Sequence, residues 1–260
     1  MLIYYPGAYA LINQESLYHR IQYWYNSPLG HLVLETENDQ LHEFLGERFG
    51  YYSLQLGGPT QAKFLTTGPI GHKIYLDLEQ TSNYHDSSIV GQFDDLPFLP
   101  NTIDIVIAQH ILEFTEQPKR ILSEIYHTLI PEGHVIIIGF NPLSLWSLMH
   151  LYKRHSIAPW QGKFISVSRM RHWLIQLGFT IVKHKTFFFR PPLLNKQIMQ
   201  KILFMEKIGP RLWPCCGAIY MIVAKKTVVA LTPVKQKKQL IKHRVATAKT
   251  YAEPTTRNIK

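Results

Sequence analysis

Four short apolar runs separated by helical patterns constrain the fold of this chain more than any other feature. The runs are SLQL (53–56), KIYLD (73–77), IDIVIA (103–108) and HVIIIGF (134–140), and each is too short for a helix. They are apolar without alternation, as expected for a parallel sheet that helices cover on both faces. Between the last two runs, Ile121, Leu122, Ile125 and Leu129 recur at helical spacing. The pattern predicts an α/β fold with a doubly wound, mostly parallel sheet.

Further elements are predicted on both sides of this block. Ser27 and Pro28 have the residue types of a helix start, with serine as the cap and proline at the first helical position. Residues 141–155 and 168–177 indicate two helices, residues 179–189 and 218–224 indicate two strands, and another helix is expected between those strands. We therefore divide the chain into an N-terminal helical segment (1–50), a main domain (51–232) and a basic tail without ordered structure (233–260).

Charge is distributed unevenly along the chain. Residues 1–149 contain 6 Lys and Arg against 16 Asp and Glu, whereas residues 150–211 contain 12 against 1. The segment 141–215 also holds four of the five tryptophans and the run Phe187–Phe189. Three interpretations stay open: contact with anionic lipid that admits a lipophilic substrate, contact with nucleic-acid phosphates, or a packed lid with solvated lysines. Because Leu, Ile, Met and Phe accompany the charge, we rank the membrane above nucleic acid.

Several classes of protein find no support in the sequence. The two cysteines, Cys215 and Cys216, are adjacent, which argues against a disulfide framework and for a reducing compartment. No set of Cys and His at metal-ligand spacing is visible, so no metal site is predicted. The N-terminus does not resemble a signal peptide, and no apolar run approaches the roughly 18 residues of a transmembrane helix. We expect a cytoplasmic protein.

Polar and glycine residues follow the predicted strands, where ligands bind in open α/β sheets. Gly57 and Gly58 come directly after the first strand and could admit a ligand to the backbone, although two glycines taken alone favour a tight turn. Asp77 ends the second strand, where a carboxylate can accept hydrogen bonds from both ribose hydroxyls; Glu79 is an alternative. Gln109 and His110 follow the strand at 103–108. All of these residues are expected at one edge of the sheet.

Three blocks closely resemble class I S-adenosylmethionine-dependent methyltransferases of the type 11 group. They are DDLPF, IDIVIAQHILEF and LSEIYHTLIPEGHVIIIG, and the resemblance covers residues 53–140. The stretches YNSPLGHLVLE, FNPLSLW and RPPL resemble a bacterial branch of this family. The resemblance implies a seven-stranded, Rossmann-like sheet with an antiparallel edge strand, and S-adenosylmethionine as the cofactor. The segment 141–215 would then supply the lid and the substrate elements.

The resemblance also implies a role for each residue of the site. Gly57 and Gly58 would form the cofactor loop, with Gln55 at the position where the family usually has an acidic residue. Asp77 would hold the ribose, Gln92 would accept a hydrogen bond from the adenine amino group, and Phe93 would lie against the ring. The departures from the family pattern are Gln55, Pro59, Gln61 and Gln92. They motivate an alternative function, a non-catalytic binding or scaffold protein with a degenerate cofactor loop.

The implied activity is methyl transfer to an unidentified small-molecule or lipophilic acceptor. Gln109 and His110 would line the site of transfer. His110 is the candidate catalytic base, and a wall residue or a structural hydrogen bond is the alternative for it. No Asn/Asp-Pro-Pro-Tyr stretch follows the strand at 103–108, which argues against enzymes that methylate amino groups of nucleic acids. A nicotinamide-dependent oxidoreductase is disfavoured because G-x-G-x-x-G is absent.

Overall fold

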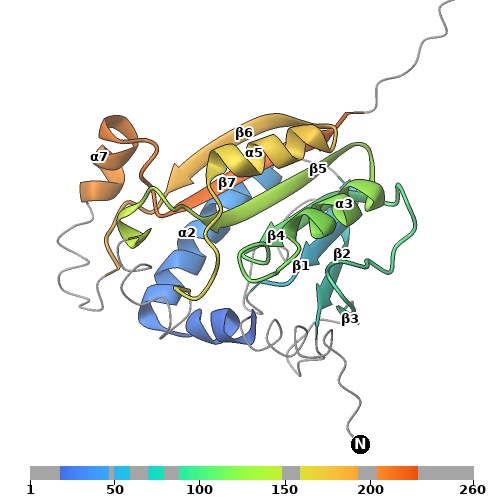
Figure 1. Ribbon diagram of the computed structural model, residues 1–260, viewed down its shortest axis with the longest axis horizontal. Helices are drawn as coiled ribbons and strands as arrows, with labels where there is room; N and C mark the ends of the chain where they lie inside the picture. Colours follow the sequence, from blue (N-terminus) through green and yellow to red (C-terminus); the bar gives the residue numbers. More distant parts are fainter. Residues whose placement is uncertain are drawn as a thin grey trace, which may run out of the picture. The chain divides into compact units, whose positions relative to one another are not determined.

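A computed structural model describes residues 18–46, 50–58, 70–78, 88–147, 159–192 and 204–227. Its described strands form one seven-stranded sheet in the order β3-β2-β1-β4-β5-β7-β6 (Figure 1). The strands are β1 (Gly50–Leu56), β2 (Ile70–Asp77), β3 (Ser88–Val90), β4 (Ile103–Gln109), β5 (Leu129–Phe140), β6 (Phe179–Phe187) and β7 (Ile219–Lys226). The strands β1 to β5 pair in parallel, and β7 pairs antiparallel with both β5 and β6. The predicted α/β sheet with an antiparallel pair at one edge is confirmed.

Two details of the sheet differ from the sequence prediction. β3 has only three residues and lies in a connection that shows no strand pattern. β5 begins at Leu129, whereas the sequence placed Leu129 in the preceding helix and the strand start at His134. The backbone becomes extended at Leu129, because Pro131 cannot continue a helix. The pairing of β4 with β5 is irregular between Ile103 and Ile105, and a proline is tolerated at such an irregularity.

Helices lie on both faces of the sheet (Figure 1). α3 (Pro118–Thr128) and α5 (Val167–Gln176) cover one face, α2 (Pro28–Leu45) covers the other, and α7 (Phe204–Leu212) lies beyond the end of β6. The predicted start of α2 is confirmed, since Ser27 Oγ accepts a hydrogen bond from the amide of Gly30 at 3.0 Å. A further helical stretch at residues 18–24 precedes α2, and the sequence pattern did not predict it.

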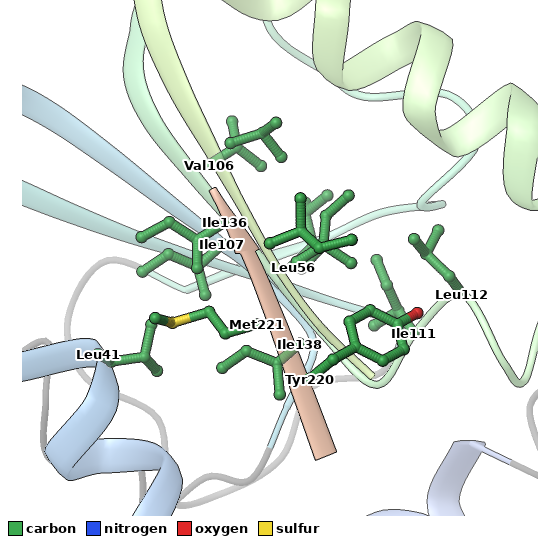
Figure 2. Packing of buried hydrophobic residues seen from close by; sticks show 14 of the residues in the cluster. Leu41, Leu56, Val106, Ile107, Ile111, Leu112, Ile136, Ile138, Tyr220 and Met221 are labelled. Atoms are coloured by element: carbon green, nitrogen blue, oxygen red, sulfur yellow. The ribbon is translucent and has the colours of Figure 1, made fainter. Parts of the chain in front are cut away.

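The N-terminal helices share one hydrophobic core with the sheet. Figure 2 shows Leu41 of α2 beside Met221 of β7, and both side chains are buried. Trp146 and Phe188, which belong to the segment 141–215, are also fully buried, and Trp146 Nε1 donates a hydrogen bond to the carbonyl of Arg190 at 2.9 Å. Part of this segment therefore packs into the core, as the interpretation as a packed lid expects.

Some sequence predictions fall outside the described residues. They are the helix expected after Gly58, the positions Pro59, Gln61 and Glu79, the second half of the helix at 141–155, and the tail at 233–260.

Candidate functional site

The loop after β1 is shaped by two glycines in the left-handed region of backbone conformation. Gly57 has φ +57° and Gly58 has φ +90°, a region that favours glycine. The amide of Gly57 donates a hydrogen bond to the carbonyl of Leu76 in β2, and Gln55 Nε2 donates one to the carbonyl of Gly57 at 2.8 Å. The amide nitrogen of Gln55 thus stabilises the conformation of the loop. Its Oε1 is buried and finds no hydrogen-bond partner among the described residues.

Asp77 lies next to this loop at the end of β2, as predicted. Its side chain is buried, and Oδ1 accepts a hydrogen bond from the amide of Leu78 at 2.7 Å. Its Oδ2 accepts a hydrogen bond from Gln22 Nε2 at 3.0 Å. The same Gln22 nitrogen lies 3.4 Å from the carbonyl oxygen of Gly58. The structure therefore brings Asp77 and the glycine loop together around one residue of the N-terminal helical stretch.

The two residues predicted to contact an adenine ring lie in different environments. Phe93 is buried, and its ring meets the ring of Tyr18 edge to face, with 5.4 Å between the centroids. Gln92 is exposed and pairs through its backbone with Asp95. Tyr18 connects Phe93 to the glycine loop, because a Cβ atom added to Gly57 would clash with the Tyr18 hydroxyl. Phe93 thus reaches the glycine loop through Tyr18, while the exposed Gln92 follows Gly91, whose amide donates a hydrogen bond to the carbonyl of Asp77 at 2.9 Å.

Gln109 and His110 bind a carboxylate that the sequence analysis did not select. Glu37 of α2 is fully buried; its Oε2 accepts hydrogen bonds from Gln109 Nε2 at 2.6 Å and from the Tyr25 hydroxyl at 3.0 Å. Its Oε1 lies 2.8 Å from His110 Nε2. On the other side of the ring, His110 Nδ1 lies 3.5 Å from Glu113 Oε1, an ion-pair contact rather than a hydrogen bond. The imidazole is thus enclosed between two buried carboxylates.

This arrangement keeps the imidazole protonated. Burial by itself would lower the pKa of His110, but the neighbouring Glu37 and Glu113 carboxylates outweigh it and raise the pKa to about 9. His110 also has φ +52°, which is uncommon for a residue other than glycine. Glu113 Oε1 in turn accepts a hydrogen bond from the amide of Phe140 at 2.6 Å, which ties the cluster to the end of β5.

The Glu37 carboxylate also determines how the Gln109 amide is oriented. A carboxylate only accepts hydrogen bonds, so the NH₂ group of Gln109 must face Glu37 and its carbonyl oxygen must point away. That oxygen is buried, without a hydrogen-bond partner among the described residues, and would lie 2.9 Å from a Cβ atom added to Gly58. The unsatisfied Gln109 oxygen therefore adjoins Gly58, whereas the Gln55 atom nearest to the same added Cβ is Nε2, at 2.7 Å. A buried acceptor without a partner beside the loop suits a ligand with an ammonium group.

The sequence did not predict five residues of this site, Tyr18, Gln22, Tyr25, Glu37 and Glu113. Glu37 did carry a signal. It interrupts the series Val33, Leu41 and Leu45 at four-residue spacing on α2, and all four side chains are buried. A lone carboxylate on the apolar face of a helix requires a buried partner. Tyr18 and Gln22 carried no comparable signal.

Other kinds of site have less support. Among the residues that the structure describes, no group of three or more His, Cys, Asp or Glu side chains could hold a metal ion. Within the same residues, no helix has the length and apolar character needed to cross a membrane. A separate cavity of about 560 Å³ lies between the start of α5, β6 and the residues after α7, and none of the predicted site residues lines it.

Comparison with known sequences identifies relatives of the chain. A family model described as "Methyltransferase domain" matches residues 73–137, from β2 into β5. The uncharacterized protein YafS of Escherichia coli is 25% identical over 226 residues, which cover 83% of this chain and 85% of YafS. The ubiquinone/menaquinone biosynthesis C-methyltransferase UbiE of Vibrio cholerae is 29% identical over 140 residues, which cover 46% of this chain and 54% of UbiE.

Solved structures show the same fold. A methyltransferase of Thermotoga maritima matches with a TM-score of 0.57 at 16% identity, covering 81% of this chain and all of that chain. The 1,6-didemethyltoxoflavin N1-methyltransferase of Burkholderia thailandensis matches with a TM-score of 0.54 at 18% identity, covering 88% and 93%. Residues 73–137 therefore match a methyltransferase domain, and the described residues have the fold of S-adenosylmethionine-dependent methyltransferases.

Proposed function

We propose that this enzyme transfers the methyl group of S-adenosylmethionine to a small lipophilic acceptor at the carboxyl edge of β1, β2 and β4. The observation that carries the proposal is the convergence of Gly57, Gly58, Asp77 and Gln109 at that edge, with the unsatisfied Gln109 oxygen beside Gly58. In open α/β sheets this edge is where ligands bind.

The residues present fit the parts of the cofactor. Gln55 Oε1 and Gln109 Oε1 would accept hydrogen bonds from its ammonium group, Asp77 would bind the ribose hydroxyls, and Phe93 would contact the adenine. The neutral Gln55, which stands where the family usually has an acidic residue, still offers an acceptor because its nitrogen is occupied by Gly57. When bound, the cofactor supplies a methyl group on a positively charged sulfur. The chain's own task is then to bind and align the two reactants.

In this proposal His110 is a positioning residue and does not act as a base near neutral pH. A general base must be unprotonated to accept a proton, whereas Glu37 and Glu113 hold the imidazole in its protonated form. The protonated ring fixes the turn after β4 and, through Glu37, the Gln109 amide. An acceptor that already carries a reactive lone pair or a negative charge would need no base.

In a protein that already carries Gln22→Ala, and so lacks the internal donor to Asp77 Oδ2, replacing Asp77 by alanine is expected to weaken cofactor binding about tenfold, because a charged hydrogen-bond acceptor for the ribose is lost. Isothermal titration calorimetry with S-adenosylmethionine and S-adenosylhomocysteine measures the effect. Asp104→Ala is the matched control, because Asp104 binds the amides of Tyr51 and Tyr52 at the opposite end of β1. An unchanged dissociation constant for Asp77→Ala would contradict the placement of the ribose.

An apolar stripe on α7 supports a lipophilic acceptor taken up at a membrane surface. Phe204, Ile208 and Leu212 lie four residues apart on this helix, and their exposed fractions are 56%, 41% and 64%. Lys207 and Arg211 accompany them on the same helix. Exposed apolar side chains beside cations are typical of helices that lie on anionic bilayers. A relative named for ubiquinone/menaquinone biosynthesis is consistent with such an acceptor.

Replacing Phe204, Ile208 and Leu212 together by serine is expected to reduce binding to vesicles of phosphatidylcholine and phosphatidylserine at least tenfold. Each change removes buried apolar area from the bound state. Vesicle flotation measures the bound fraction. Serine replacements of Tyr23, Val90 and Leu99, which are exposed elsewhere, are the matched control. Equal recovery of the two triple variants, or equal recovery of the unmodified protein with neutral vesicles, would contradict the proposal.

A further inference from the structure

The helical stretch at residues 18–24 covers the groups to which we assign the cofactor. Two side chains one helical turn apart, Tyr18 and Gln22, contact all three parts of that site. Gln22 Nε2 donates a hydrogen bond to Tyr18 Oη at 2.8 Å, so that the two side chains form one unit. The following steps rest on the proposed function, because they take Gly57, Asp77 and Phe93 as the cofactor site.

Gln22 occupies the position of a hydrogen-bond donor to Asp77. Its Nε2 lies 3.0 Å from Asp77 Oδ2, while the amide of Leu78 already binds Oδ1. A ribose hydroxyl that donates to Oδ2 would approach the same oxygen from the space that Gln22 fills. The Gln22 amide therefore donates to Asp77 Oδ2 the hydrogen bond that a ribose hydroxyl would donate.

Tyr18 fills the space above the loop and against Phe93. Its hydroxyl lies so close to Gly57 that even a Cβ atom on that glycine would clash with it. Its ring covers Phe93 edge to face, which contributes to the burial of both rings. A cofactor bound against Gly57, Asp77 and Phe93 would overlap with the side chains of Tyr18 and Gln22.

We propose that Tyr18 and Gln22 compete with the cofactor for its site and must be displaced before it binds. Ile21 on the helical stretch and Tyr25 directly after it are buried in the core, so the stretch is held in place when the cofactor is absent. The open form is then only a fraction of the protein, and the apparent affinity for cofactor is lowered by that fraction. Weakening the internal contact should raise the affinity.

Gln22→Ala is expected to bind S-adenosylhomocysteine about tenfold more tightly than the unmodified protein. The variant removes a hydrogen bond to a charged group that exists only in the closed form. Calorimetric titration measures the dissociation constants, and thermal unfolding checks the fold of each variant. Tyr23→Ala is the matched control, because Tyr23 lies on the same helical stretch and is 80% exposed. Its affinity should equal that of the unmodified protein.

Weaker or unchanged binding by Gln22→Ala would overturn the competition, since Gln22 would then support the bound cofactor or leave it unaffected. Absence of binding by the unmodified protein and by Gln22→Ala would instead contradict the proposed cofactor site itself. Binding by Gln22→Ala alone would support the competition.

Hydrogen exchange of the unmodified protein gives an independent measurement. The amides of residues 18–24 should exchange faster when S-adenosylhomocysteine is bound, and slower exchange would overturn the proposal.

A double-mutant cycle separates the two roles of Asp77. In the unmodified protein, Asp77→Ala removes the ribose partner and also the partner of Gln22, so the two effects on affinity oppose each other. In the Gln22→Ala background the opposing effect of the Gln22 contact is absent. The competition therefore predicts a larger loss of affinity for Asp77→Ala in that background, and equal losses in both backgrounds would count against it.

Discussion

Replacing Glu37 by leucine is expected to lower the free energy of unfolding by about 3–5 kcal/mol, the usual cost of removing one partner of a buried ion pair. Leucine fills a similar volume but accepts no hydrogen bond. It would leave the Gln109 amide and the Tyr25 hydroxyl buried without their acceptor, and His110 without its closest carboxylate. Urea unfolding measures the difference.

Glu35→Leu is the matched control for this prediction. Glu35 lies on the same helix but is exposed, so its replacement should change the free energy of unfolding by no more than about 0.5 kcal/mol. A loss below about 1 kcal/mol for Glu37→Leu would mean that the cluster contributes little to the fold.

The free energy of unfolding is expected to decrease as the pH rises from about 6.5 to about 9. The folded protein holds the His110 proton up to a pKa of about 9, whereas the unfolded chain releases it near the ordinary value of 6.5. The stabilisation is therefore complete below pH 6.5 and is lost as the pH rises through 9, a change on the order of 3 kcal/mol. Tyr25 and Tyr220 contact the same cluster, but burial raises the pKa of both phenols well above 10, outside this window.

Urea unfolding between pH 6 and pH 9.5 measures this dependence, with His110→Asn as the comparison. Asparagine tolerates the left-handed backbone conformation of residue 110 and has no proton to release in this range. The difference in stability between the two proteins should shrink with rising pH. A difference that stays constant from pH 6 to pH 9.5 would show that folding does not raise the pKa of His110.

The strand ends of the site could be predicted from the sequence, and the groups that face them could not. Gly57, Asp77 and Gln109 each follow an apolar run, and parallel strands bring such positions to one edge. Their partners come from far away in the sequence: Gln22 lies 55 residues before Asp77, and Glu37 lies 72 residues before Gln109. No local pattern encodes such contacts. β3 was missed for a related reason, because three residues give too short a pattern to read.

The row of Val33, Glu37, Leu41 and Leu45 on α2 has a consequence for how the protein folds. Three of these side chains belong to the core of the sheet, while the fourth completes the ion-pair cluster at the end of β4. Docking this one helix therefore buries the apolar face and brings the Glu37 carboxylate against the protonated His110 in the same step. We expect the N-terminal helices and the sheet to unfold cooperatively, so that the boundary near residue 50 separates two patterns in the sequence but not two independent folding units.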